Sequence, residues 1–150
     1  MAFNILLAGD GSKSSFRAAD FVIEMMKRNP QVRVTVLSVF PAAERSGPKQ
    51  EGEEIEFSFI MHDKLMETVE ESITNIEKKY KEYFAGEGLE IIYEHRFGDP
   101  AERICRYAER RDFDLIAVGT RGLKGFEGLV LGSVAHKVVH LSKIPVLLVR

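Results

Sequence analysis

Glycines near the C-terminus mark the segment whose residue types could do chemistry. The stretch from Gly119 to Ser133 holds five of the chain's 12 glycines within 14 positions: Gly119, Gly122, Gly125, Gly128 and Gly132. Glycine allows positive φ and a close approach of the backbone, so successive N–H groups can point into one concavity. The stretch leads into a predicted helix beginning at Ser133, where free N–H groups and the helix dipole favour an anion. Hydroxyl and cationic side chains lie nearby, namely Thr120, Arg121, Lys124 and Ser133.

These features support a phosphate-binding loop, and a flexible surface loop with a Gly-Ser helix cap is the alternative. The Walker A motif needs Gly-Lys-Ser/Thr, but the first turn reads Gly11-Ser12-Lys13-Ser14, and Leu6 stands where the earlier glycine is required. The dinucleotide motif would begin at Gly9 and Gly11 but meets Ser14 in place of its third glycine. Neither of these nucleotide motifs is therefore present.

Asp10 is separated from the first apolar run by Gly9 alone and has two interpretations. A carboxylate at a strand end can accept hydrogen bonds from sugar hydroxyls, whereas next to a pyrophosphate its charge would be repulsive. The first interpretation therefore makes Asp10 a ribose ligand. In the second, Asp10 or Ser12 simply caps the following helix.

The histidines predict no metal or catalytic site. His136 and His140 lie four residues apart and could share a helix face, but a metal would need further ligands. Ser133 is expected at a helix start rather than in a nucleophile elbow, so no Ser-His-Asp triad is proposed. We predict no catalytic residue and no metal ligand.

The elements that position these residues alternate between strands and helices. Short apolar runs predict five strands, at 3–8, 32–39, 89–93, 115–119 and 145–149. Apolar stripes at spacings of three and four predict helices at about 13–29, 61–85 and 133–141. Asp99, Pro100 and Glu102 form a capping box at the start of a further helix.

This order predicts one α/β domain over residues 1–150, with a doubly wound parallel sheet and helices on both faces. Ligands in such sheets bind beyond the carboxyl ends of the strands, where the strand order reverses. Both Asp10 and Gly119 follow such ends. The polar segment from Pro41 to Ile60 is longer than a typical connector, and we expect a lid, a mobile loop or an extra half-helix there.

Composition excludes several classes of protein. The net charge of −2 gives no global attraction to nucleic acid or to an anionic membrane. A single cysteine, Cys105, rules out an internal disulfide and favours a reducing compartment. No apolar stretch approaches the ~20 residues that span a bilayer, and nothing resembles a signal peptide. We therefore expect a cytoplasmic protein.

The motifs together resemble the universal stress protein family. The phosphate loop of its ATP-binding members has the pattern Gly-x2-Gly-x9-Gly-Ser/Thr, and this chain reads Gly119-x2-Gly122-x9-Gly132-Ser133. The resemblance extends over the whole chain, through Asp10 to Ser12, Gly98 to Glu102, Asp114 to Gly122 and Pro145 to Val149.

The resemblance implies strand order 3-2-1-4-5, with an adenine nucleotide such as ATP bound between strands one and four. Asp10 would then hold the ribose, Val39 would line the adenine pocket, and Mg²⁺ or Mn²⁺ could accompany the phosphates. The nucleotide-binding residues it implies are Asp10, Val39, Gly119, Arg121, Gly122, Gly132, Ser133 and Val134. It also implies a homodimer through the last strand, Pro145 to Val149, whose apolar edge would otherwise favour aggregation.

The sequence departs from the family at Gly9, where a larger residue is usual, so we expect a looser wall beside the adenine. Three functions remain open. The first is a non-catalytic stress-response module in which nucleotide occupancy biases a dimer or partner surface. The second is a slow ATPase or nucleotidyl-transfer enzyme, and the third is a dimeric scaffold that binds no nucleotide.

Overall fold

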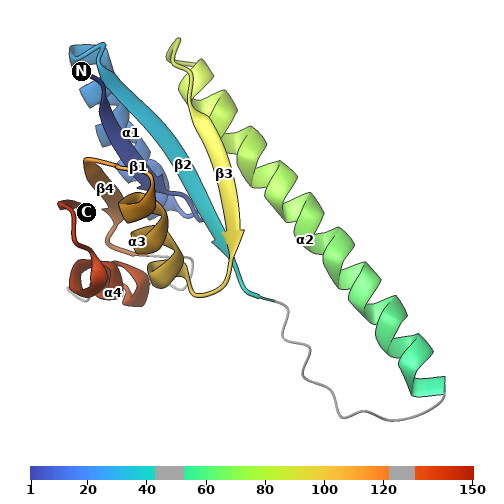
Figure 1. Cartoon of the computed structure of the whole chain (residues 1–150). Coiled ribbons are helices and arrows are strands. Elements are labelled where there is room, and N and C mark those ends of the chain that lie inside the picture. Colours follow the sequence, from blue (N-terminus) through green and yellow to red (C-terminus); the bar gives the residue numbers. More distant parts are fainter. Residues whose placement is uncertain (43–52, 122–130) are drawn as a thin grey trace.

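A computed structural model of the chain describes residues 1–42, 53–121 and 131–150 (Figure 1). Strands and helices alternate along these residues. The strands are β1 (Phe3–Ala8), β2 (Val32–Phe40), β3 (Ile92–Phe97), β4 (Leu115–Gly119) and β5 (Val146–Val149), and the helices are α1 (Lys13–Arg28), α2 (Glu53–Ala85), α3 (Pro100–Arg110) and α4 (Ser133–Leu141). The α/β class predicted from the sequence is confirmed.

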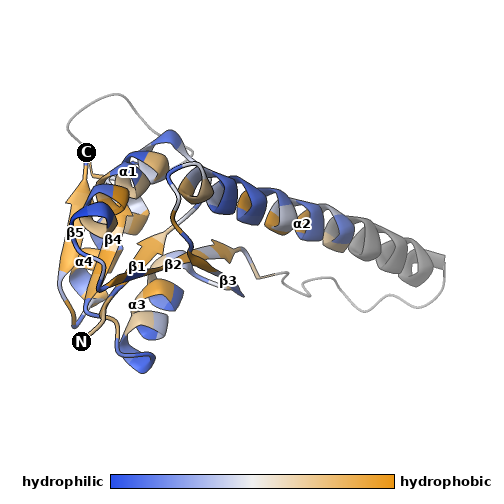
Figure 2. Cartoon of the chain, turned by 90° about the horizontal axis from the view of Figure 1, so that it is seen from above, coloured by the Kyte–Doolittle hydropathy of each residue, from blue (hydrophilic) through white to orange (hydrophobic). Residues whose placement is uncertain are grey.

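The five strands form one parallel sheet in the order β3-β2-β1-β4-β5, as the resemblance implies. In the register, Ile5 lies opposite Val34 of β2 on one side and Leu115 of β4 on the other. Helices α1 and α2 cover one face of the sheet, and α3 and α4 cover the other (Figure 2). The strand order therefore reverses at β1. In sheets of this kind a ligand-binding crevice is expected at the carboxyl ends of the strands at the reversal, here β1 and β4.

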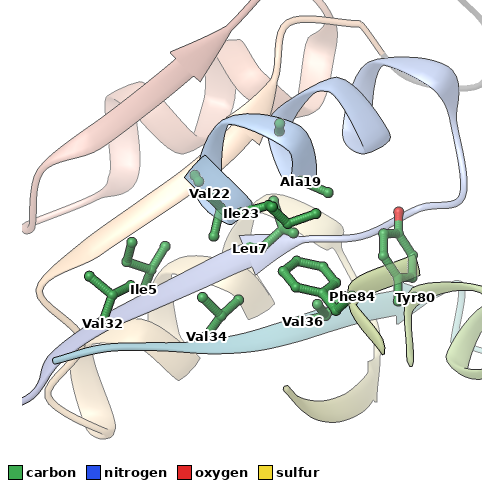
Figure 3. Packing of buried hydrophobic residues seen from close by; sticks show 12 residues of the cluster. Ile5, Leu7, Ala19, Val22, Ile23, Val32, Val34, Val36, Tyr80 and Phe84 are labelled. Atoms are coloured by element: carbon green, nitrogen blue, oxygen red, sulfur yellow. The ribbon is translucent and has the colours of Figure 1, made fainter. Parts of the chain in front are cut away.

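Two hydrophobic cores hold the layers together, one on each face. On the α1 and α2 face, Ile5, Leu7 and Val36 of the sheet pack against α1 and against Tyr80 and Phe84 of α2 (Figure 3). On the other face, Leu6, Leu37 and Ile116 of the sheet pack against α3 and α4, which contribute Ile104 and Val138. The nearly continuous burial of β1 and β4 is typical of central parallel strands.

The prediction for the third strand was wrong by three to four residues. The N–H of Leu89 donates to the carbonyl of Phe84 at 3.0 Å and helps to end α2, with Gly88 at φ +72°. Leu89 and Ile91 pack as half-buried residues against the α1 and α2 core. The apolar run therefore serves the helix exit, and strand pairing begins at Ile92.

The segment expected to be a lid, a loop or an extra half-helix divides into two parts. Residues 43–52 lie outside the described residues, and from Glu53 onward the chain is helical as the start of α2. That helix therefore begins eight residues before the predicted position. None of the helices in the described part of the chain is both long and apolar enough to cross a membrane.

Candidate functional site

The predicted site residues gather at the carboxyl ends of three neighbouring strands. Asp10 follows β1, Val39 lies near the end of β2, and Gly119 ends β4. Adjacent parallel strands place these ends at the same edge of the sheet. The chain leaves β1 toward α1 and leaves β4 toward α4, on opposite faces, so the three residues lie around the crevice.

The turn after β1 is closed by its own side chains. One carboxylate oxygen of Asp10 accepts a hydrogen bond from the N–H of Ser12 at 2.9 Å. Ser12 is the N-cap of α1, and its hydroxyl accepts from the N–H of Ser15 at 3.1 Å. Of the two predicted capping candidates, Ser12 thus caps the helix directly. Asp10 is exposed, and its second carboxylate oxygen has no partner among the residues that the structure describes.

Backbone hydrogen bonds bring the two ends of the glycine-rich loop together. The N–H of Gly132 donates to the carbonyl of Thr120 at 2.6 Å, and the N–H of Thr120 donates to Val149 in β5 at 3.0 Å. The N–H of Arg121 donates to the hydroxyl of Ser14 in α1 at 3.1 Å. Gly119 and Arg121 therefore lie beside Gly132 and the start of α4. Gly122, also expected to bind phosphate, lies outside the described residues.

The N-terminus of α4 lacks a side-chain cap. Its N-cap is Gly132, and its first turn contains no acidic residue. The first helical hydrogen bond runs from the N–H of His136 to the carbonyl of Gly132 at 2.9 Å, so the N–H groups of Ser133 and Val134 precede it and have no partner in the described part of the chain. Ser133 itself is exposed. Such a terminus carries partial positive charge and open donors, which suit a phosphate.

An apolar wall lies on the same side of the sheet as α4. Ala8, Val39 and Val134 are half-buried and pack against the α3 and α4 core. Ala8 ends β1, Val39 is the last residue but one of β2, and Val134 lies in the first turn of α4. A partly exposed apolar surface next to a helix N-terminus with open donors can hold a planar base while its phosphates reach those donors.

The next feature is the pair of histidines on α4, for which the sequence predicts no metal site. His136 and His140 are both exposed on α4, with ring centroids 4.6 Å apart. Over residues 1–42, 66–121 and 131–150, no group of three or more His, Cys, Asp or Glu side chains lies close enough together to hold a metal ion.

Comparison with known proteins places the chain in a family. The model of the universal stress protein family matches residues 1–150. This chain belongs to the universal stress protein family. It is 33% identical over 147 residues to a universal stress protein of Bacillus subtilis, YxiE, covering 97% of each chain.

Solved structures of universal stress proteins share this fold. A UspA protein from Lactobacillus plantarum has a TM-score of 0.80 at 21% identity, covering 99% of this chain and 97% of that chain. A family member from Arabidopsis thaliana, solved with AMP bound, has a TM-score of 0.62 at 18% identity, covering 98% and 90%. These likenesses establish the architecture that positions the crevice.

The space beside Gly9 of this universal stress protein is filled on the α1 and α2 face. A Cβ built on Gly9 would lie 2.6 Å from Cγ1 of Val36 and 2.9 Å from the ring of Tyr80. Tyr80 of α2 is fully buried, and its ring stacks on Phe16 with centroids 4.6 Å apart. The tyrosine ring therefore occupies the space beside Gly9 on the α1 and α2 face, while the looser wall beside the adenine stays a prediction.

Tyr80 also holds the turn that carries Asp10, a role that the sequence reasoning missed. Its hydroxyl accepts from the N–H of Gly11 at 3.0 Å and lies 2.6 Å from the hydroxyl of Ser15. The Ser15 proton is directed to the carbonyl of Ser12 at 2.8 Å, so Tyr80 must donate to Ser15. Burial raises the pKa of Tyr80 to about 12, although the hydrogen bond from the N–H of Gly11 opposes the rise. Gly9 is the feature of the sequence that could have indicated this role of Tyr80. A missing side chain at a buried strand end requires another residue to fill the space.

Gly119 is likewise required by packing. A Cβ at this position would lie 2.6 Å from the backbone carbonyl oxygen of Ser14. The end of β4 thus touches the first turn of α1, and the Arg121–Ser14 hydrogen bond depends on that approach. One glycine of the predicted loop therefore serves to join two elements at the crevice.

Proposed function

We propose that this chain is a non-catalytic adenine-nucleotide-binding protein of the stress response, with the nucleotide in the crevice between β1 and β4. The observation that carries the proposal is the meeting of three unlike features there. These are the exposed carboxylate of Asp10, the uncapped N-terminus of α4 at Gly132 and the apolar wall that includes Val39. A ribose, a phosphate chain and a base need these three kinds of partner. The AMP-bound Arabidopsis relative, which has the same fold, supports the same ligand class.

The phosphate part of the proposal assigns Gly119, Arg121, Gly122, Gly132, Ser133 and Val134 to the phosphate chain. With φ −58° and ψ 153°, Gly132 has a backbone conformation open to other residues, so replacing it need not strain the chain. Gly132→Val would instead place a branched side chain beside the open N–H groups. We expect this variant to fold and to lose nucleotide binding.

The experiment measures binding by calorimetry after bound nucleotide has been removed and identified by acid extraction. ATP with Mg²⁺, AMP and cyclic AMP are titrated into the original chain, into Gly132→Val and into Gly86→Val. Gly86 is an exposed glycine past the end of α2, where a Cβ would meet its nearest neighbour at an ordinary 3.5 Å. The proposal requires binding by the original chain and by the Gly86 control, and its loss in Gly132→Val. No heat with any nucleotide at millimolar concentration would refute it.

The role of Asp10 has its own test, because a ribose ligand must distinguish sugars. Asp10→Asn keeps an oxygen for the N–H of Ser12 but removes the charge. A hydrogen bond to a charged group contributes about 1.5–3 kcal/mol, which corresponds to about 10- to 100-fold in affinity. We expect Asp10→Asn to weaken ATP binding by that factor and to weaken binding of 2′,3′-dideoxy-ATP much less. Asp114→Asn is the matched control, since Asp114 also accepts one backbone N–H, from Asn4 at 2.7 Å, at the opposite edge of the sheet.

We further propose a homodimer through β5, through which nucleotide occupancy can act. This strand is an edge of the sheet, and exposed apolar side chains lie on it and on α4: Leu148 is 38% exposed, Val139 45% and Leu141 43%. An open apolar edge favours pairing with a second copy. Leu148→Glu should convert a dimer to a monomer in light scattering, whereas Ile92→Glu on the other edge strand should not. A monomeric original chain would refute this proposal and leave the nucleotide proposal intact.

A further inference from the structure

Arginines converge on a surface hollow between α3 and β3. The hollow has a volume of about 190 Å³ and is lined by five arginines and one tyrosine: Arg96, Arg103, Arg106, Tyr107, Arg110 and Arg111. We call it the arginine hollow. Because β3 is the edge strand farthest from β4, the hollow is separate from the crevice between β1 and β4.

The charges of α3 are divided between its two sides. On the α4 side, Glu102 pairs with Lys137 at 3.8 Å and Glu109 pairs with Lys143 at 2.8 Å. The arginines at 103, 106 and 110 follow a spacing of three and four along the other side. The acids of the helix are therefore already neutralised away from the hollow.

Few acids face the arginines themselves. Among the described residues, only Arg96 of the five has a carboxylate partner, Glu94 at 3.3 Å. Like charges gathered in one hollow repel each other. A bound anion would remove this cost.

Several of these guanidinium groups are held in place before any ligand arrives. The guanidinium carbons of Arg96 and Arg111 lie 5.0 Å and 4.8 Å from the centre of the Tyr107 ring, which is 8% exposed and forms the base of the hollow. Gly98 has φ +132°, and a Cβ there would lie 2.7 Å from Nε of Arg103. The missing side chain lets Arg103 lie close to the backbone. Preorganised donors lose less entropy when they bind.

We propose that the arginine hollow binds a compact polyphosphate group, either as a free chain or as the phosphate tail of a larger molecule. Its volume is below the ~300–1,000 Å³ of pockets that enclose drug-sized ligands, so it suits a small, highly charged group. Guanidinium forks bind phosphate oxygens in bidentate pairs. A polyphosphate brings several negative charges into a small volume, whereas the carboxylates of an acidic peptide are kept apart by its backbone.

The test maps and measures the binding of tripolyphosphate to the whole chain. In NMR titrations, we expect tripolyphosphate to shift the amide signals of Arg96 and of residues 103–111. Shifts at residues 132–135 report binding in the crevice and are analysed separately. Shifts confined to residues 132–135 would overturn the proposal even if the nucleotide proposal holds. Conversely, if the chain binds no nucleotide in the crevice, tripolyphosphate should still shift the signals of residues 103–111.

Two double variants measure the contribution of the arginines. Arg106→Gln with Arg110→Gln removes two exposed charges from the hollow, and Arg28→Gln with Lys79→Gln removes two exposed charges elsewhere. We expect at least a 10-fold loss of tripolyphosphate affinity at the hollow for the first pair and less than 2-fold for the second. Equal losses in both pairs would show a general charge effect and overturn the proposal.

Comparison ligands identify the source of the phosphate. Orthophosphate or a poly-glutamate peptide that shifts residues 103–111 at concentrations as low as tripolyphosphate would overturn the choice of polyphosphate. ATP that shifts these residues at the same concentration as tripolyphosphate would identify a nucleotide tail as a source. Shifts with tripolyphosphate alone would identify the free chain.

Discussion

Replacing Tyr80 by phenylalanine tests how α2 supports the crevice. The substitution keeps the ring that stacks on Phe16 and fills the space beside Gly9, but removes the hydroxyl. The hydrogen bonds from Gly11 to Tyr80 and from Tyr80 to Ser15 are both lost. The turn that carries Asp10 then loses its hydrogen bond to α2, while the packing of the ring beside Gly9 remains.

The expected loss follows from which groups are left without a partner. Ser15 keeps its bond to the carbonyl of Ser12, so its hydroxyl proton stays satisfied. The N–H of Gly11 loses its acceptor, the Tyr80 hydroxyl. A partly buried donor without a partner costs about 1–3 kcal/mol. We expect Tyr80→Phe to lower the free energy of unfolding by about 2 kcal/mol. For a chain of 150 residues this corresponds to a fall of ~4–8 °C in Tm.

Urea unfolding and amide exchange measure this effect together. Exchange at the Gly11 amide should become faster in Tyr80→Phe, while amides in β1 change only by the global loss of stability. Tyr83→Phe is the control, since Tyr83 is exposed and bonds Asp20 on the surface, where a change of about 0.5 kcal/mol or less is expected. If Tyr80→Phe is as stable as the original chain and Gly11 stays protected, the hydroxyl does not hold the turn.

Three further predictions concern the same region and α3. The unfolded chain ionises Tyr80 near pH 10 and the folded chain near pH 12, so stability present below pH 10 is lost as pH rises, by up to about 3 kcal/mol; alkaline urea titrations should show this component disappear in Tyr80→Phe. Gly119→Ala should cost about 1–3 kcal/mol because its Cβ meets the backbone of Ser14, whereas Gly86→Ala should cost far less in the same thermal assay. Asp99→Ala should cost about 1 kcal/mol at pH 7 through loss of the α3 cap. The hydrogen bond from the N–H of Glu102 lowers the pKa of Asp99 below its usual 3.8. The stability difference between Asp99→Ala and the original chain should therefore be present above pH 3.8 and shrink as the pH falls below it.

Short local patterns, such as apolar runs and helix caps, were enough to predict the fold from the sequence. Apolar runs marked β1 and β4 to the residue, because central strands covered on both faces have few polar positions. The sequence Asp99-Pro100 marked the start of α3, because a cap and a proline act within one turn. The third strand was misplaced because Leu89 and Ile91 are apolar for a different reason, namely packing at the exit of α2.

The contacts that complete the site join residues far apart in the chain, and no local pattern reports them. Tyr80 and Gly11 are 69 positions apart, and Arg121 and Ser14 are 107 apart. In the sequence, Tyr80 is one member of an apolar stripe, and its hydroxyl has no visible partner until α2 is packed on the sheet.

The glycines show why a motif alone does not assign a role. Gly11, at φ +80°, is required by backbone conformation, whereas Gly9 and Gly119 have no positive φ and are required by space. Gly9 admits the ring of Tyr80, and Gly119 admits the first turn of α1. Through these two approaches α2 and α1 are fixed against the ends of β1 and β4, where Asp10 and Arg121 lie. Part of the glycine spacing therefore serves the packing of α1 and α2 against the strand ends, and not only the backbone freedom of a loop.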